Sequence, residues 1–293
     1  MYKAITKYLC CPKCRAKLSL RVDNENEEDV LEGVLSCENG HSFRVSQGVA
    51  DFNSEEQGFI NQWESMGEEQ NFEEIDREMD MKNPGEMSQR REMVLGAIAD
   101  TVSGQDCKVV LDIASGRGLM LAELVKTLDA DVHIISIDLS KFVLKYDYRK
   151  FKEIAPDRKI SYLACDATRL PLKDSVIDAA VTYAGFSNMF GCAGEALREA
   201  YRAIKPGGVL VDSYVVIAEE SQGFEALHRV CTEQNISGAE DFFLHDGIAR
   251  HHEELFSAVK CNVVFEGIGV DNGMDLLPYQ GEWYAEQVFV SSK

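Results

Sequence analysis

The chain has 293 residues and carries 50 acidic against 30 basic side chains, a formal net charge of −20. A chain of this length can bury one sizeable core and still hold an accessory module. The negative charge disfavours a polyanionic partner, since proteins bind nucleic acids through cationic groups that neutralise phosphates. The sequence has no apolar run near the ~20 residues that span a bilayer and no signal-peptide pattern at its start. We therefore expect a cytoplasmic protein with no membrane partner.

Two short metal-binding knuckles are predicted near the N-terminus. Cys11 and Cys14 are separated by two residues, Cys37 and His41 by three, and about twenty residues lie between the pairs. This ligand set is typical of a tetrahedral Zn²⁺ site, and four protein ligands would make it structural and closed to substrate. Cys10 is an alternative to Cys11, and two unrelated pairs of reduced cysteines are the alternative to a metal site. The stretch between the pairs alternates apolar and polar residues, which predicts a β-hairpin.

An acidic segment follows at residues 54–80, with ten acids against one base. Its apolar residues recur at helical spacing, which predicts one or two amphipathic helices. These helices would either cover a ligand site, with Trp63 and Phe72 facing it, or pack on the core with a solvated acidic face. Pro-Gly at 84–85 then predicts a linker, and residues 86–102 predict the helix that opens a larger domain.

The most informative pattern lies at residues 109–118. An apolar strand that contains Asp112 ends in a turn of small residues, 114–118, and an apolar helix follows. Small residues allow a backbone to approach a ligand closely. Two further predicted strands end at Asp138 and Asp166. Three carboxylates are therefore expected along one edge of a parallel sheet, the edge at which open α/β sheets bind ligands.

The next part of the chain distinguishes this pattern from that of dinucleotide-binding proteins. A helix from residue 196 is stopped by Pro206 and turned by two glycines into a strand at 209–217, and the segment 166–172 precedes a strand at 176–183. Together with the small-residue turn, these motifs resemble class I S-adenosylmethionine-dependent methyltransferases. The resemblance implies an α/β fold with a Rossmann-like seven-stranded sheet, helices on both faces, and S-adenosylmethionine as cofactor.

Three parts of the chain are therefore expected. A zinc ribbon would occupy residues 1–54, an acidic helical linker or lid 55–85, and the S-adenosylmethionine-binding domain 86–293. In the last of these, a helical insertion at about 219–259 would form the variable substrate-recognition region, before two strands close the sheet. Residues 8–53 also resemble the zinc ribbon fused to some methyltransferases, including the bacterial large-subunit rRNA guanine-N1 methyltransferases. A ribbon of this kind is a possible protein-docking module.

The resemblance implies cofactor-binding roles for seven residues: Asp112, Ala114, Gly116, Gly118, Asp138, Asp166 and Ala167. Asp112 would orient the methionine amino group, and Asp138 would bind the ribose hydroxyls. Asp166, with the amide of Ala167, would read the adenine edge. Ala114 stands where the family usually has the first glycine of the turn. The alternative is a plain strand-to-helix connection in which the acids act only as caps.

Methyl transfer from a sulfonium is already downhill, so the enzyme mainly has to align the reacting groups and exclude water. A general base is optional. The strand that ends at 183 should face the reacting centre, so Tyr183 and Asn188 are the catalytic candidates. Candidate substrate contacts are Trp63, Phe72, Phe186 and Tyr214. Candidate bases in the variable region are His245, His251 and His252.

The net charge favours a small-molecule acceptor, with the acceptor atom unspecified. The bases are unevenly distributed, however, because residues 1–22 hold six bases and no acid and residues 141–159 hold seven bases against three acids. A local basic face of this kind would suit an rRNA base methyltransferase, which is the alternative function. A second alternative is a non-catalytic, cofactor-binding regulatory or scaffold protein that docks through the zinc ribbon.

Overall fold

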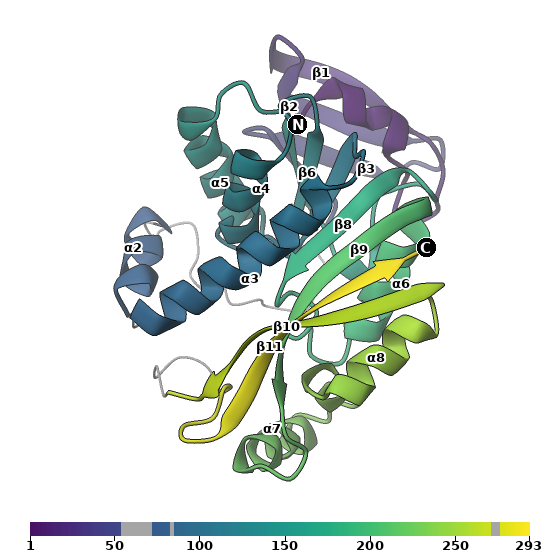
Figure 1. The fold of residues 1–293 in the computed structure, drawn as a ribbon. Coiled ribbons are helices and arrows are strands. Elements are labelled where there is room, and N and C mark those ends of the chain that lie inside the picture. The colour runs from purple at the N-terminus through teal and green to yellow at the C-terminus, as the bar shows by residue number, and fades with distance from the viewer. Residues whose placement is uncertain (54–71, 83–84, 271–275) are drawn as a thin grey trace.

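A computed structural model of the chain describes residues 1–53, 72–82, 85–270 and 276–293 (Figure 1). Across these residues, one sheet of eleven strands has the order β1-β2-β3-β4-β7-β6-β5-β8-β9-β11-β10. Helices cover both of its faces. No helix in the described ranges is long and apolar enough to cross a membrane.

Seven of the strands form the predicted Rossmann-like sheet. They are β5 (Val109–Ile113), β6 (His133–Asp138), β7 (Ile160–Ala164), β8 (Ile177–Tyr183), β9 (Ile204–Ile217), β10 (Ala258–Ile268) and β11 (Trp283–Ser292). Strands β5 to β9 pair in parallel, and β11 pairs antiparallel with both β9 and β10. Every residue of β5, β6 and β7 is buried, as expected for parallel strands covered on both faces. The predicted fold class is confirmed.

The helices pack in two layers. They are α2 (Phe72–Lys82), α3 (Gly85–Ser103), α4 (Leu119–Thr127), α5 (Lys141–Ile154), α6 (Ala193–Ala203), α7 (Gln222–Glu233) and α8 (His245–Glu253), with short 3₁₀ turns η1 (Lys3–Tyr8), η2 (Ala167–Arg169) and η3 (Glu240–Phe243). Helices α3, α4 and α5 share one apolar core with the sheet. Helices α6 and α8 share a second core, to which the N-terminal residues also contribute. The helix predicted at 86–102 is α3.

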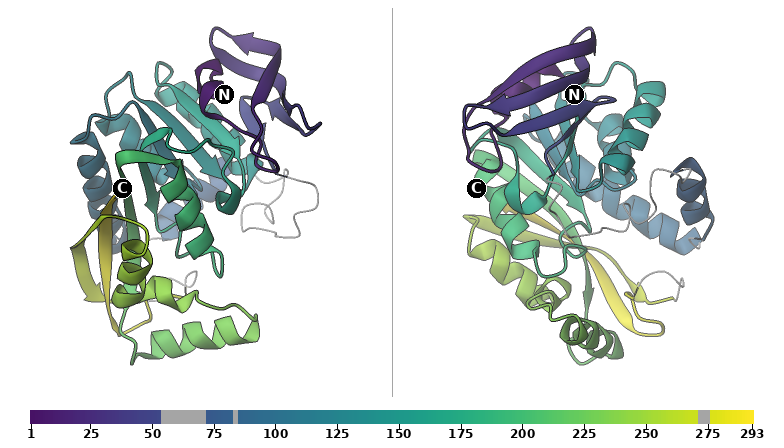
Figure 2. Two further views of the ribbon diagram at one scale, coloured as in Figure 1. Left: turned by 90° about the vertical axis from the view of Figure 1, so that its right-hand side faces the viewer. Right: turned by 180° about the vertical axis from the view of Figure 1, so that it is seen from behind.

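Four N-terminal strands extend the main sheet. They are β1 (Leu18–Asn26), β2 (Asp29–Cys37), β3 (Ser42–Ser46) and β4 (Val49–Asp51). Successive strands pair antiparallel, and β1 with β2 forms the predicted hairpin. Strand β4 then pairs in parallel with β7, so the N-terminal strands continue the same sheet (Figure 2).

Two predicted boundaries are wrong. Helix α6 ends at Ala203, and β9 begins at the next residue, so Pro206 lies inside a strand rather than between a helix and a strand. The pairing of β8 with β9 is irregular there, between Ile177 and Ala179, and irregular pairing tolerates a residue without an N–H. The helical stretch predicted to run to residue 259 instead consists of η3 and α8, and β10 begins at Ala258.

Candidate functional site

A cavity of about 650 Å³ lies at the carboxyl ends of β5, β6, β7 and β8. The strand order reverses between β5 and β8, and open α/β sheets bind ligands at such a point. The volume is also in the range of small-molecule sites. Of the predicted cofactor-binding and catalytic residues, those that line this cavity are Asp112, Ala114, Gly116, Asp138, Asp166, Ala167, Tyr183 and Asn188. The structure therefore gathers residues from four separate strand ends around one space.

The turn after β5 uses left-handed backbone conformations. The φ angles are +55° at Ala114, +53° at Gly116 and +76° at Gly118. Gly118, at the start of α4, does not line the cavity; a Cβ there would lie 2.9 Å from the Phe151 ring and 3.0 Å from the Asp147 carboxylate. Close packing of α4 against α5 therefore requires this glycine. Ala114 adopts the left-handed conformation despite its methyl group, an uncommon arrangement that is found more often at functional sites.

Asp112 is a buried carboxylate on the cavity wall. Its side chain is fully buried, and among the described residues its carboxylate makes no close hydrogen bond, only a weaker contact with the Ser136 hydroxyl. Burial and, secondarily, the nearby charge of Asp138 raise the pKa of Asp112 well above its usual value. A buried polar group without a partner is destabilising. A bound ammonium group would supply the missing partner.

The other two predicted acids are held by backbone groups. The two carboxylate oxygens of Asp138 accept the N–H of Gly116 at 3.0 Å and the N–H of Ser140 at 2.9 Å. One oxygen of Asp166 accepts both the N–H and the hydroxyl of Thr168, each at 2.8 Å. These contacts fix the direction of both carboxylates toward the cavity that they line.

Helix α2 forms one wall of the cavity through Met79. Ion pairs hold this helix against the turn after β5. Buried Arg117 pairs with Asp76 and, at 3.0 Å, with Asp80. Asp76 also accepts bonds from Lys150 Nζ at 2.9 Å and from the Tyr146 hydroxyl at 3.0 Å, which fastens α2 to α5. Part of the acidic segment therefore does border the cavity.

The four predicted metal ligands form a compact cluster. The ligand atoms of Cys11, Cys14, Cys37 and His41 all lie within 4.8 Å of one another. The sulfurs of Cys14 and Cys37 are 3.8 Å apart, and His41 Nδ1 lies 3.4 Å from the sulfurs of both Cys11 and Cys37. A tetrahedral ion with bonds of about 2.3 Å to sulfur separates its ligands by about 3.8 Å. Cys10 is buried outside this cluster.

The sequence matches the model of the ubiE/COQ5 methyltransferase family over residues 64–230, more than half of the chain. The chain belongs to this family. It is 30% identical over 102 residues to a ubiquinone/menaquinone biosynthesis C-methyltransferase from Wigglesworthia glossinidia brevipalpis, covering 35% of this chain and 40% of the relative. The protein of the same description from Escherichia coli O1:K1 / APEC is 29% identical over 122 residues, 41% of this chain and 48% of the relative. The chain thus spans less than half the length of these relatives.

Solved structures share the fold at low sequence identity. The YcgJ protein from Bacillus subtilis has a TM-score of 0.50 and 12% identity, and the match covers 68% of this chain and 98% of YcgJ. Geranyl diphosphate C-methyltransferase from Streptomyces coelicolor A3(2), solved with geranyl diphosphate and S-adenosyl-L-homocysteine, has a TM-score of 0.50 and 13% identity, covering 69% and 79% of the two chains. Both support the methyltransferase fold.

Several predicted substrate contacts and bases do not reach the cavity. Phe186 and Tyr214 are buried in the apolar core, and Phe72 lines a separate cavity beside α5. Trp63 lies outside the described residues. The Tyr214 hydroxyl donates to Asp212 and lies 3.1 Å from Nε2 of fully buried His252. The three candidate bases have other partners: His252 also contacts Ser291, His251 contacts Asp241, and His245 contacts Gln287.

Sequence reasoning missed several residues of the cavity wall. They include Met79, Arg117, Thr168, Gly185, Met189, Phe190 and Cys192. A Cβ on Gly185 would lie 2.0 Å from the Thr182 hydroxyl and 3.0 Å from the Ala114 Cβ, so the turns after β5 and β8 touch at this glycine. A small residue just beyond the end of a predicted strand was the available signal. The sequence held no such signal for Arg117, because its ion-pair partners lie on α2, a distant part of the chain.

Proposed function

We propose that the chain is an S-adenosylmethionine-dependent methyltransferase that acts on a small-molecule acceptor. Family membership supports the reaction class, and one observation supports the cofactor most directly. That observation is the fully buried carboxylate of Asp112, which makes no close hydrogen bond among the described residues, on the wall of a cavity that Asp138 and Asp166 also line. The methionine ammonium of the cofactor is a cation of the right size and charge to neutralise it.

The remaining cavity residues fit the other parts of this cofactor. Asp138, which accepts the N–H groups of Gly116 and Ser140, would also accept the ribose hydroxyls. Asp166 and the amide of Ala167 would bind the adenine edge. When bound, the cofactor supplies an electrophilic methyl group on its sulfonium sulfur.

The acceptor side would be formed by the end of β8 and the loop after it. Tyr183 and Asn188 line the cavity there and would position the acceptor by hydrogen bonds, while Met189 and Phe190 add apolar walls that exclude water. Met79 of α2 covers the cavity from another side. The two relatives described above are named as C-methyltransferases of quinone biosynthesis, so a carbon acceptor is the first kind to test.

Calorimetry with S-adenosylhomocysteine tests the cofactor assignment. We expect Asp112→Asn to weaken binding by about one to two powers of ten, because the ammonium loses a charged partner. Asp147→Asn is the matched control, since Asp147 is also fully buried and unpartnered in the described chain but does not line the cavity. Unchanged affinity in Asp112→Asn, or no binding by the wild-type chain, would overturn the assignment. Radiolabel transfer from S-adenosylmethionine into small molecules of a cell extract then tests turnover.

We also propose that Cys11, Cys14, Cys37 and His41 hold a structural Zn²⁺ ion. The separation of their ligand atoms supports this, as does a donor set of three thiolates and one imidazole. With four protein ligands the ion has no open position, so it would stabilise residues 1–54 rather than take part in methyl transfer.

A further inference from the structure

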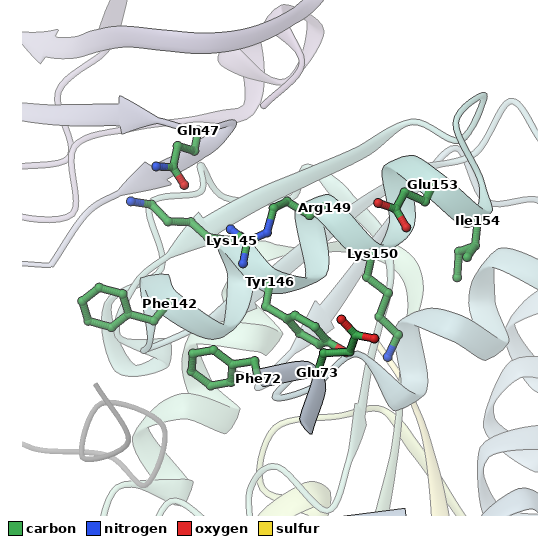
Figure 3. Close-up of a pocket in the computed structure, with 10 residues that line it drawn as sticks. All are labelled: Gln47, Phe72, Glu73, Phe142, Lys145, Tyr146, Arg149, Lys150, Glu153 and Ile154. Carbon is green, nitrogen blue, oxygen red and sulfur yellow. The ribbon is translucent and has the colours of Figure 1, made fainter. Parts of the chain in front are cut away.

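A second cavity, of about 740 Å³, lies beside α5 and is bordered by α2 and the turn between β3 and β4 (Figure 3). We call it the α5 cleft and define it by Gln47, Phe72, Phe142, Lys145, Tyr146 and Arg149, with Glu73, Lys150, Glu153 and Ile154 completing its wall. The proposed methyl transfer uses none of these side chains. The cleft therefore needs its own explanation.

Two cations in this cleft lack the ion pairs that their neighbours have. Lys141, Lys150 and Lys152 of α5 pair with Asp51, Asp76 and Asp29 at 3.2, 2.9 and 2.8 Å. Lys145 and Arg149 have no ion-pair partner in the ranges that the structure describes. They are one helical turn apart, and like charges at this spacing destabilise a helix. In a chain with 50 acids to 30 bases, such a pair indicates a binding role.

Within the described ranges, neither acid of the cleft forms an ion pair with Lys145 or Arg149. Glu73 pairs with Arg77 of its own helix at 3.7 Å. Figure 3 shows Glu153 beside Ile154, at the end of the cleft opposite Gln47 and Lys145. The cleft therefore has a cationic end, and the aromatic rings of Phe142 and Phe72 lie on the side below it in the same view.

The turn that carries Gln47 is the two-residue loop between β3 and β4. Gln47 has a φ of +53°, and Gly48 after it has a φ of +81°. A Cβ on Gly48 would lie 2.3 Å from the Tyr148 ring, so the turn packs directly on α5. Glycine or asparagine would suit the conformation of Gln47 better. A two-residue hairpin loop requires these positive φ values, and the loop holds the Gln47 amide so that it points toward Lys145 (Figure 3).

We propose that the α5 cleft binds a small organic anion. Its phosphate or carboxylate group lies between Lys145, Arg149 and the Gln47 amide, and a flat apolar group packs on Phe142. The volume of about 740 Å³ suits a single small molecule rather than a polymer. The net charge of −20 also opposes a polyanion. This site does not depend on the proposed methyl transfer.

Calorimetry on the full chain, without S-adenosylmethionine, tests the proposal with four probes. The probes are 1-naphthyl phosphate, 1-naphthoate, neutral 1-naphthol and inorganic phosphate. We expect one or both naphthyl anions to bind at least about tenfold more tightly than 1-naphthol and than inorganic phosphate. The reason is that 1-naphthol lacks the anionic group and inorganic phosphate lacks the aromatic rings. Whichever anion binds more tightly identifies the charged group.

Three variants locate the binding. The double variant Lys145→Gln/Arg149→Gln should weaken binding of the naphthyl anion at least about tenfold. Lys159 is exposed and lies outside the cleft, so Lys159→Gln is the matched control and should not change binding. Gln47→Gly should weaken binding severalfold yet melt no lower than wild type, because glycine suits the positive φ. Equal binding by the double variant, or no naphthyl anion binding to wild type, would overturn the proposal. So would tighter, steeply salt-dependent binding of a single-stranded RNA oligonucleotide that the double variant loses.

Discussion

The cavity at the ends of β5 to β8, which we propose binds the cofactor and call the cofactor cavity, meets the α5 cleft at α2, and the two carry opposite charge. Phe72, the first residue of α2, lines the α5 cleft, and Met79, two turns later, lines the cofactor cavity. The cavity wall holds the carboxylates of Asp112, Asp138 and Asp166. The cleft instead exposes cations of α5. The net charge of the chain, −20, does not indicate the local charge of either site. The class of ligand therefore follows from the charged residues of each site.

The two sites also differ in the structural elements that form their walls. The cofactor cavity is formed by the ends of buried parallel strands, whose backbone groups fix its acids. The α5 cleft depends on the turn between β3 and β4. The cysteine cluster lies in the same N-terminal part of the chain, where Cys11 and Cys14 precede β1, Cys37 ends β2 and His41 precedes β3. Perturbing one wall at a time should therefore separate the two binding activities.

Loss of the cysteine cluster should have the largest effect. If the cluster holds Zn²⁺, purified chain should contain about one zinc, and Cys37→Ser should lose it and destabilise the N-terminal strands by at least about 3 kcal/mol. Binding of the naphthyl anion should fall with the loosened β3–β4 turn, while S-adenosylhomocysteine affinity should change little. Metal analysis, thermal melting and calorimetry measure the three quantities.

Cys107→Ser is the matched control for that variant, because Cys107 is a buried cysteine outside the cluster. It should keep the zinc. Full zinc occupancy in Cys37→Ser would exclude the metal site as proposed. If Cys37→Ser lost binding of the naphthyl anion and of S-adenosylhomocysteine equally, the α5 cleft and the cofactor cavity would not be structurally independent.

Asp138→Ala should affect only the cofactor cavity. The variant removes the acceptor for the ribose hydroxyls and should cost roughly 1.5–3 kcal/mol of S-adenosylhomocysteine binding, one to two powers of ten in affinity. Binding in the α5 cleft should be unchanged. Asp138→Asn, which keeps one acceptor oxygen for the turn, should fall between Asp138→Ala and wild type in calorimetry. A variant that binds the cofactor normally would show that this acid only supports the turn.

The pH dependence of the two sites should differ. Burial raises the pKa of Asp112, so a falling pH protonates its carboxyl and removes the charge that would attract the cofactor ammonium. S-adenosylhomocysteine affinity should then fall, by at most about tenfold per pH unit. Binding of 1-naphthoate in the α5 cleft does not involve Asp112, so it should be constant as the pH falls. Calorimetry between pH 7.5 and 5.5 measures both affinities. An equal fall in the two affinities would contradict the prediction that the sites differ.

Local sequence pattern sufficed to predict which carboxylates lie together at the edge of the sheet. Asp112, Asp138 and Asp166 each lie in or just after an apolar strand, and the carboxyl ends of parallel strands meet at one edge. The cysteine cluster was equally local, because two short turns each supply two neighbouring ligands. The seven-stranded sheet followed from the same strand and turn signals.

The positions of the other predicted site residues depend on packing between distant parts of the chain. Phe186 lies only three residues beyond β8, yet its side chain turns into the core, and the sequence holds no sign of that direction. Tyr214 is surrounded by the rings of Phe242, His252 and Phe289, which all come from later parts of the chain. The α5 cleft joins the β3–β4 turn to a helix almost a hundred residues later in the chain, so the basic residues of 141–159 alone did not predict it.

The smallest expected effect comes from Asp76, which links the two sites. Its carboxylate pairs with Arg117 of the cofactor cavity and with Lys150 of the α5 cleft. Asp76→Asn should loosen α2 from both and weaken S-adenosylhomocysteine and the naphthyl anion by a few-fold each. Asp80 pairs with Arg117 at 3.0 Å and with Arg91 at 3.1 Å. Asp80→Asn is thus a matched control that should weaken only the cofactor. Calorimetry on both variants decides whether α2 is a shared wall, since an Asp76→Asn variant that alters one ligand alone would show that the two sites are separate.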